Sequence, residues 1–190
     1  MALRRPLRAW IDSNLLVSQE LASLTAALAH CTSMDVRILK KEKLKLIIRS
    51  YRQKDVEDLI EVWYESTITA HDFIPEEKWR SHKEDLRLKY LPVAETWVAE
   101  MNGELVGFVS LLGDYIGALF VKPSWQGKAV GSNLLNHVME INNILNVGVY
   151  KKNEKARCFY EKHGFQYINE EKQKETGEIV QNMTKKTMVV

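Results

Sequence analysis

The segment VKPSWQGKAVGS, residues 121–132, decides the fold of this chain because it leads an apolar strand through a glycine-containing turn directly into a helix. The helix is indicated by apolar residues at three- and four-residue spacing, namely Leu134, Leu135, Val138 and Ile141. Such a helix start presents unpaired backbone N–H groups and a partial positive charge to one place, where a phosphate or pyrophosphate can bind. The residues fit an ordinary turn with a packing glycine equally well. Neither Gly-x-Gly-x-x-Gly nor Gly-x-x-x-x-Gly-Lys-Ser/Thr occurs, which disfavours dinucleotide-binding and P-loop enzymes.

Immediately before this segment, the sequence predicts a three-strand meander. Two strand-like runs, Thr96–Met101 and Glu104–Leu112, are joined by Asn102-Gly103, the dipeptide that best tolerates a type I′ turn. A second short turn leads into the run Tyr115–Val121. We therefore expect these three strands to pair antiparallel.

The amino-terminal part of the folded region predicts one strand and two helices. Leu46–Tyr51 is a short β-branched run that is typical of a strand. Asp55 is suited to cap the next helix, whose buried face is predicted to hold Val56, Leu59, Ile60 and Trp63. Pro75 fits the first turn of a second helix, which we expect to end near Tyr90.

The carboxyl-terminal part predicts strand, helix and two strands. Val147–Tyr150 is a brief strand, and a helix follows from about Asn153 to Lys162, where Gly164 fits the position just past its end. Phe165–Ile168 and roughly Ile179–Thr187 complete the chain. This element order fits neither simple βαβ units nor an all-β fold, and it indicates an α+β fold with a mixed sheet covered by helices.

Composition indicates one compact domain, since the chain has 190 residues of which 45% are hydrophobic. Cys31 and Cys158 are far apart and form no Cys-x-x-Cys pair, so we expect no disulfide, no metal site and a reducing, cytoplasmic setting. Residues 1–45 hold eight Lys/Arg and four Asp/Glu, whereas residues 46–190 hold 19 and 21. The folded part therefore lacks the cationic stripe that a nucleic-acid partner requires.

Residues 1–45 are expected to form an N-terminal extension, helical or partly disordered, and residues 46–190 the folded domain. The apolar stretch 15–29 follows three arginines, but Glu20 interrupts it. It is neither the continuous core of a signal peptide nor the roughly 20 apolar residues of a membrane span, so no membrane partner is expected. A mitochondrial-type presequence and a true start at Met34 are the alternatives.

Three segments carry a resemblance to a known family. QGKAVG, residues 126–131, resembles the Gln/Arg-x-x-Gly-x-Gly/Ala signature of the GNAT superfamily of N-acetyltransferases, and ALFVKP, residues 118–123, resembles its fourth strand. VYKKNEKARCFYEKHGF, residues 149–165, is similar to the fifth strand and following helix, and it is the most specific of the three. The resemblance covers residues 46–187 and implies a GNAT-like mixed, mostly antiparallel sheet with helices on both faces. The chain looks most similar to small bacterial acetyltransferases, some of which acetylate protein lysines.

The resemblance implies that acetyl-CoA is the co-substrate and that a primary amine attacks it directly in a ternary complex. The acceptor is a small amine or a protein lysine, and both a monomer and a homodimer are consistent with the sequence. A non-catalytic acyl-CoA-binding sensor is the alternative function. A third hypothesis is a structural or interaction protein that binds no CoA.

The family also implies which residues hold the cofactor, because its fourth and fifth strands splay apart and free backbone groups for the pantetheine arm and the thioester carbonyl. The matching positions here are Leu119, Phe120, Val121, Gln126, Gly127, Lys128, Ala129, Val130, Gly131, Ser132 and Asn153. Asn153 is equally suited to be a helix cap. Ala129 departs from the family, since it stands where the signature usually has its first glycine. It costs little if its φ is helical and about 1 kcal/mol or more if its φ is positive.

Tyr160 is the principal catalytic candidate, since it matches the family's tyrosine that donates a proton to the departing CoA sulfur. Without the surrounding motif, packing of the helix on the sheet would explain this tyrosine as well. Cys158 has no adjacent basic partner, so we expect it to be a small core residue and not a nucleophile.

The general base is harder to assign from the sequence. The strand that ends at Val121 has no Glu at its centre and offers only Asp114 and Tyr115 near its start. His71, beside Asp72 in the loop between the first two helices, is the candidate base. A solvated, uninvolved histidine and proton loss through ordered water are the alternatives. Four aromatic residues are candidates for either the acceptor pocket or the core: Trp63, Phe73, Trp79 and Trp97.

Overall fold

The computed structural model describes residues 45–186. The helical elements are η1 (Gln53–Asp55), α2 (Val56–Ala70), α3 (Glu76–Ser81), α4 (Lys83–Asp85), η2 (Leu86–Tyr90), η3 (Pro123–Trp125), α5 (Val130–Ile141) and α6 (Glu154–Lys162). The strands are β1 (Leu46–Ser50), β2 (Glu95–Met101), β3 (Glu104–Leu112), β4 (Tyr115–Val121), β5 (Ile144–Tyr150), β6 (Gln166–Lys172) and β7 (Ile179–Lys186). The predicted N-terminal extension, apart from Lys45, lies outside the described residues.

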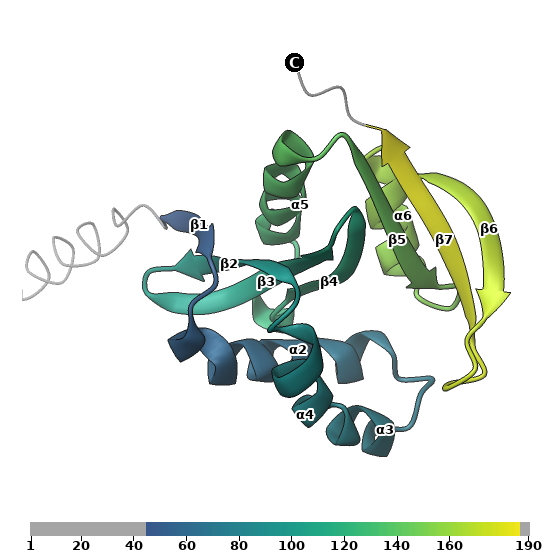
Figure 1. The fold of residues 1–190 in the computed structure, drawn as a ribbon, viewed down its shortest axis with the longest axis horizontal. Helices are drawn as coiled ribbons and strands as arrows, with labels where there is room; N and C mark the ends of the chain where they lie inside the picture. The colour runs from purple at the N-terminus through teal and green to yellow at the C-terminus, as the bar shows by residue number, and fades with distance from the viewer. Residues whose placement is uncertain (1–44, 187–190) are drawn as a thin grey trace, which may run out of the picture. The chain divides into compact units, whose positions relative to one another are not determined.

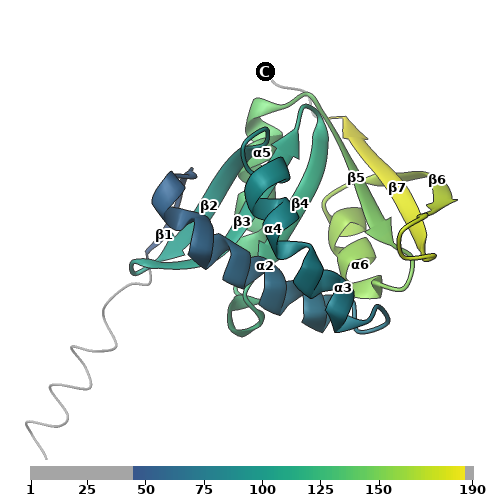
Figure 2. The same ribbon diagram turned by 60° about the horizontal axis from the view of Figure 1, so that its bottom comes forward.

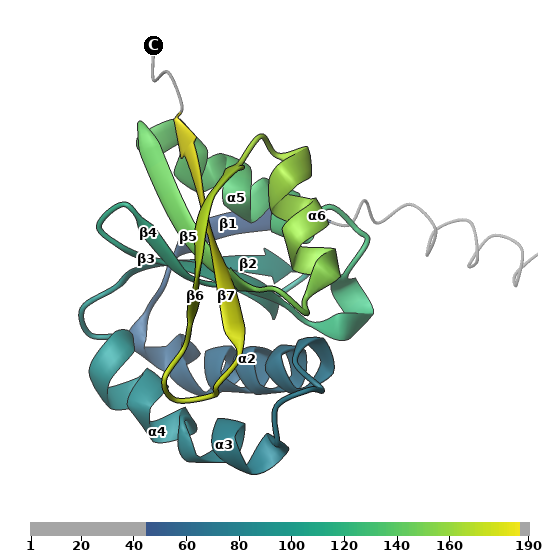
Figure 3. The same ribbon diagram turned by 90° about the vertical axis from the view of Figure 1, so that its right-hand side faces the viewer.

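The seven strands of the described part form one sheet in the order β1-β2-β3-β4-β5-β7-β6 (Figures 1 and 2). Neighbouring strands are antiparallel except β4 and β5, which are parallel. The helices α2, α3 and α4 lie on one face of the sheet, and α5 and α6 lie on the other (Figure 3). The predicted mixed, mostly antiparallel sheet with helices on both faces is therefore confirmed.

Each face of the sheet has its own apolar cluster. The α2-side cluster includes Leu59, Val98 and Phe108, all fully buried, and it contains the predicted stripe of α2. The α5-side cluster includes Leu134, Val138 and residues of α6. Burial of each such side chain contributes roughly 1.5–3 kcal/mol relative to exposure, so the two clusters hold the helices against the sheet.

The predicted hairpin between β2 and β3 is confirmed. Met101 pairs with Glu104, and the two residues between them have positive φ, 51° at Asn102 and 88° at Gly103. Positive φ at both central positions is the requirement of a type I′ turn. The meander continues into β4 as predicted.

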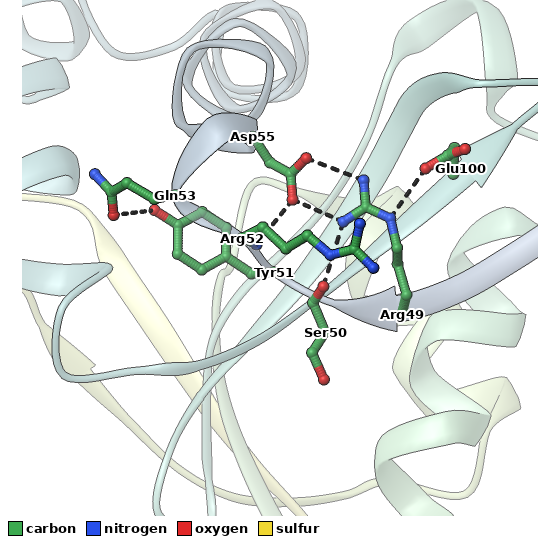
Figure 4. A network of polar contacts seen from close by, with 7 residues as sticks. All are labelled: Arg49, Ser50, Tyr51, Arg52, Gln53, Asp55 and Glu100. Atoms are coloured by element: carbon green, nitrogen blue, oxygen red, sulfur yellow. Dashed lines mark hydrogen bonds and ion pairs between the residues drawn. The ribbon is translucent and has the colours of Figure 1, made fainter.

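A polar network joins β1, β2 and the start of α2 (Figure 4). Arg49 donates two hydrogen bonds to the Asp55 carboxylate, at 2.7 and 3.0 Å, and a third to Glu100 at 3.0 Å. The Asp55 carboxylate also accepts the backbone N–H of Arg52 at 2.8 Å, so it closes the η1 turn. The prediction that Asp55 caps α2 is wrong, because η1 places Asp55 in a helical conformation and turns its side chain back toward Arg49. The hydrogen bonds from Arg49 hold the pKa of Asp55 below its ordinary value.

The single helix predicted from Pro75 to Tyr90 is divided into α3, α4 and η2. The first break is at His82, where φ is −86° and ψ is −4°. The last part is a π-helical turn, in which the N–H of Leu91 bonds to the carbonyl of Leu86 at 3.0 Å. Both leucines are buried in the α2-side cluster. The wider turn therefore brings two residues five positions apart onto one face, which a regular helix would not do.

Three smaller differences concern the carboxyl-terminal half. The last residue of the predicted apolar stripe of α5, Ile141, is 54% exposed. Strand β5 begins three residues earlier than predicted, at Ile144. The strand predicted at Phe165–Ile168 is instead β6, an edge strand that is exposed along its whole length. An exposed edge strand has no buried face to impose an apolar alternation, so its length could not be read from the pattern.

Candidate active site

A gap opens in the middle of the sheet because β4 and β5 pair over only two residues each. Tyr115 pairs with Asn146 and Ile116 with Val147, and the pairing ends there. Beyond this point residues 117–121 of β4 have no strand partner across the gap, which is visible between the two strands in Figure 1. Backbone groups that border such a gap can bind a ligand in place of a strand.

A bulge in β4 accompanies the end of the pairing. Ser110 of β3 pairs with Ala118, whereas the next residue, Leu111, pairs with Ile116. Gly117 is therefore the extra residue of β4. A bulge bends its strand and leaves a residue unpaired, so it helps to turn β4 away from β5.

The turn between β4 and α5 has left-handed backbone at two positions. Gly127 has φ +74° and Ala129 has φ +62°. No side chain caps the first turn of α5, so its N–H groups stay available to an anion. Because Ala129 has positive φ, its methyl group carries a conformational cost of about 1–2 kcal/mol.

The predicted cofactor residues Gln126 and Val121 contact each other. The side-chain amide of Gln126 donates to the Val121 carbonyl at 3.0 Å, and the Ser66 hydroxyl of α2 donates to the same oxygen at 2.9 Å. Two donors occupy both lone pairs of this carbonyl. These bonds fasten the end of β4 to α2 and to the turn, so Gln126 shapes the turn through its side chain.

The remaining predicted cofactor residues surround the same gap and turn. Leu119 packs on the α5-side cluster and Phe120 on the α2-side cluster, and both belong to the part of β4 that has no partner in β5. The Lys128 ammonium lies 4.5 Å from the centre of the Trp125 ring, beside the turn. The other three residues belong to the first turn of α5: Val130, Gly131 and Ser132.

Tyr160 projects from α6 into the α5-side cluster, where it is 6% exposed. Its ring contacts Phe159 and Phe165 at centroid distances of 5.3 and 5.1 Å. Burial raises the pKa of Tyr160 well above its ordinary value, with a further contribution from the nearby phenol of Tyr115. Tyr160 is therefore a neutral phenol that can donate a proton.

His71 and Asn153 are 82 residues apart in sequence and are in contact. The Asn153 side-chain oxygen accepts the Ala156 N–H at 3.1 Å, which confirms that Asn153 caps α6. This bond fixes the orientation of the amide, so its nitrogen faces the His71 Nε2 at 3.3 Å. Burial lowers the pKa of His71 to about 4, although the charge of Asp72 opposes that shift. The imidazole is therefore neutral at physiological pH, with Nε2 as the acceptor.

Aromatic rings enclose His71. Tyr150 of β5, Trp79 of α3 and Phe73 lie at centroid distances of 5.0, 5.5 and 5.8 Å. The Tyr150 hydroxyl in turn donates to Gln173 in the loop between β6 and β7. The sequence analysis did not predict that Tyr150 contacts His71 or that Gln173 binds Tyr150, because no local pattern reports contacts between segments so far apart in the chain.

Two predicted residues lie away from this site. Trp97 is on the other face of the sheet, where its ring contacts His137 of α5 at 5.6 Å, so it cannot wall a pocket beside His71. Cys158 is exposed, and the prediction of a core residue there is wrong. The buried face of α6 is provided by Tyr160 instead, two residues further along the helix.

Comparisons of the sequence with known proteins identify the family of this chain. A family model described as an acetyltransferase (GNAT) domain matches residues 92–167. The chain belongs to the GNAT acetyltransferases, and it is therefore an acyltransferase enzyme. Within the described residues no helix is long and apolar enough to cross a membrane.

Particular relatives are peptidyl-lysine N-acetyltransferases of Escherichia coli (strain K12). YiaC is 35% identical over 124 residues, which cover 65% of this chain and 85% of YiaC. YjaB is 38% identical over 119 residues, which cover 62% of this chain and 80% of YjaB. The solution structure of apo YjaB superposes with a TM-score of 0.66 at 30% identity, covering 74% of this chain and 97% of that one. The PaiA N-acetyltransferase of Thermoplasma acidophilum, solved in complex with coenzyme A, shares the fold with a TM-score of 0.61 at 23% identity, covering 75% and 99%.

Proposed function

We propose that this enzyme transfers an acetyl group from acetyl-CoA to a lysine side chain of a protein, by direct attack in a ternary complex. The observation that carries this proposal has two parts. The first turn of α5, which follows β4, has no side-chain cap beside the gap between β4 and β5, and the neutral phenol of Tyr160 is buried in the α5-side cluster together with residues of both strands. The names of YiaC and YjaB support lysine as the acceptor. A cytoplasmic setting stays a prediction.

The proposed binding of acetyl-CoA uses mainly backbone. The first-turn N–H groups of α5 would hold the diphosphate, with Lys128 as a nearby cation. The unpartnered edge of residues 117–120 would bind the pantetheine arm as a strand binds its neighbour, and would polarise the thioester carbonyl. The PaiA structure with coenzyme A supports this proposal at the level of the fold.

The proposed chemical step is aminolysis of the thioester. A neutral amine attacks the carbonyl carbon, the C–N bond forms, and the C–S bond breaks. The departing thiolate takes the proton of the Tyr160 hydroxyl, and the nitrogen loses one proton to solvent or to a base. Burial keeps Tyr160 protonated until the sulfur leaves, because tyrosinate is costly in an apolar site.

His71 as the general base stays a prediction. Its Nε2 lone pair faces Asn153 and its pKa is about 4, so accepting a proton there would break a hydrogen bond and place a charge in a buried site. This geometry better supports a positioning role, in which His71 joins the loop after α2 to the start of α6. Ordered water is then the route by which the amine loses its proton.

The test is release of free thiol from acetyl-CoA with a panel of lysine peptides and small amines, combined with mass spectrometry of the products. We expect acetylated lysine peptide, with turnover that depends on Tyr160. Saturable acetyl-CoA binding without turnover on any acceptor would instead indicate the sensor. Absence of any thermal stabilisation would contradict both, since a ligand at 100 times its Kd adds about 2.7 kcal/mol to the folded state.

A further inference from the structure

Tyr115 lies at the point where β4 and β5 separate, on the face of the sheet that carries α2. On β5, Val147 and Val149 face the α5-side cluster, so Gly148 between them faces the opposite side. The Tyr115 hydroxyl rests on that side, 2.5 Å from the position that a Cβ of residue 148 would occupy. Only glycine leaves room for the phenol there, because a Cβ would require Tyr115 to move.

Two more oxygen-bearing side chains share this face. Asn182 is the direct partner of Gly148, and its side-chain oxygen lies 3.4 Å from the same Cβ position. Its amide nitrogen donates to Asn169 at 2.9 Å, so the oxygen is left as an acceptor. Glu171 is paired with Val180, whose side chain also borders Gly148, and cross-strand partners point to the same side of a sheet.

The charge of Glu171 is not neutralised by an ion pair within residues 45–186, in contrast to its neighbour Glu170, which pairs with Lys151 at 3.1 Å. Burial is the main cause of a raised pKa of Tyr115. A hydrogen bond between its phenol and the backbone of Gly148 opposes this shift, and the negative charge of Glu171 adds to it. The surface formed by Tyr115, Asn182 and Glu171 over Gly148 therefore offers oxygen acceptors and one negative charge. We call it the acceptor shelf.

The acceptor shelf lies opposite Tyr160 with respect to the sheet. Tyr160 belongs to the α5-side cluster, whereas Tyr115 covers Gly148 from the other side of the sheet. Gly148 is the first residue of β5 beyond its pairing with β4. A thioester carbonyl held in the gap would therefore have the proton donor on one side and the acceptor shelf on the other.

We propose that the acceptor shelf binds the primary amine of the acceptor in its cationic form, with Tyr115 and Asn182 accepting its N–H hydrogens and Glu171 providing the counter-charge. This proposal rests on the proposed acetyl transfer and assigns its acceptor site. The hydroxyl of Tyr115 orients the nitrogen toward the gap, and the proton that the nitrogen must lose leaves through solvent over the exposed part of the shelf. Cationic alkylamines such as lysine are then preferred over amines that are uncharged at neutral pH.

The test compares Tyr115→Phe, Glu171→Gln and Gly148→Ala with the wild type, using a lysine peptide with a blocked amino terminus and an arylamine that is uncharged at pH 7. Tyr115→Phe and Gly148→Ala should raise the KM for the peptide about tenfold, as expected for loss of one hydrogen bond to a charged group, and leave the acetyl-CoA Kd within twofold. Glu171→Gln should raise the peptide KM severalfold and leave the arylamine KM unchanged. Tyr167→Phe, at an exposed tyrosine of the edge strand β6, is the matched control and should match the wild type.

Two outcomes would overturn the proposal: a peptide KM unchanged by Tyr115→Phe, or a Glu171→Gln effect equal for peptide and arylamine. Failure of the enzymatic function is separately visible, because the wild type would then acetylate no amine. In that case, calorimetry of peptide binding to the CoA-saturated protein tests the acceptor shelf independently of catalysis. Weaker binding in Tyr115→Phe supports it, and unchanged binding contradicts it.

Discussion

The two halves of the candidate active site are built from different parts of the polypeptide. The cofactor half, formed by residues 117–120 and the first turn of α5, offers backbone groups that one continuous stretch of chain supplies. The proposed acceptor half consists of side chains that the fold brings together from distant segments, as in the contact of His71 with Asn153 and the cover of Tyr115 over Gly148. A backbone-built site needs the right turn and tolerates most side chains, whereas a side-chain-built site depends on each residue.

This difference explains why Ala129 is compatible with the proposed function. Its φ of +62° is the conformation that glycine normally supplies, and the chain adopts it despite the methyl group. The backbone path of the turn is thereby kept, at a cost in stability. Substitutions in the two halves should therefore separate acetyl-CoA binding from acceptor use.

The largest expected effect concerns Tyr160, the proposed proton donor. Tyr160→Phe keeps the ring and its contacts with Phe159 and Phe165 but removes the proton donor. We expect kcat to fall at least about a hundredfold while the acetyl-CoA Kd changes less than twofold. Steady-state kinetics and calorimetry measure both, and a kcat within threefold of the wild type would remove Tyr160 from the mechanism.

The acceptor half should show a pH-dependent stability that originates at His71. Its folded-state pKa of about 4 is below the value of about 6.5 in an unfolded chain, so between these pH values only the unfolded state takes up the proton. The free energy of unfolding should therefore fall as the pH is lowered from about 6.5 to 4, by an amount on the order of 1–3 kcal/mol. Urea denaturation across this range measures the effect. His71→Gln should flatten this part of the profile, and an identical profile in the variant would show that another group causes the dependence.

In the cofactor half, two glycines form a matched pair. Gly127 and Gly177 have φ of +74° and +75°, and an added Cβ would meet nothing within 4 Å at either. Alanine at each should destabilise the protein by about 1–2 kcal/mol. Only Gly127→Ala should also weaken acetyl-CoA binding, because strain there shifts the turn amides, whereas Gly177 lies in the loop between β6 and β7. Equal acetyl-CoA affinities in the two variants would argue against a diphosphate site at the turn.

The smallest effect is expected at Ala129. Ala129→Gly should relieve the positive φ and stabilise the protein by up to about 1 kcal/mol, reduced by the greater freedom of glycine in the unfolded chain. For a domain of this size the Tm should rise by at most about 2–4 °C, as differential scanning calorimetry can measure. A lower Tm would mean that the alanine methyl makes a stabilising contact.

The sequence predicted the fold well where a local pattern imposes structure. The Asn102-Gly103 turn, the stripe of α2 and the meander into β4 follow from turn chemistry and periodicity. The π-helical turn η2 was not predicted, because it depends on the burial of Leu86 and Leu91 in the α2-side cluster, a tertiary contact that no local pattern reports.

The candidate site was also predicted only in the part that depends on a local pattern. The motif at residues 126–131 predicted the turn and helix start of the proposed cofactor half, because that pattern is local. The contact of His71 with Asn153 spans 82 residues, and the cover of Tyr115 over Gly148 depends on strand pairing, so neither was visible in the sequence.

The most direct test of the backbone-built cofactor half is a titration of ¹⁵N-labelled protein with acetyl-CoA, followed by amide chemical shifts. The largest shifts should come from residues 127–132 and from the unpaired part of β4, with smaller shifts at α2 and α3. If acetyl-CoA binds and leaves the amides of residues 127–132 unchanged, the helix start does not hold the diphosphate and the account of this site is contradicted.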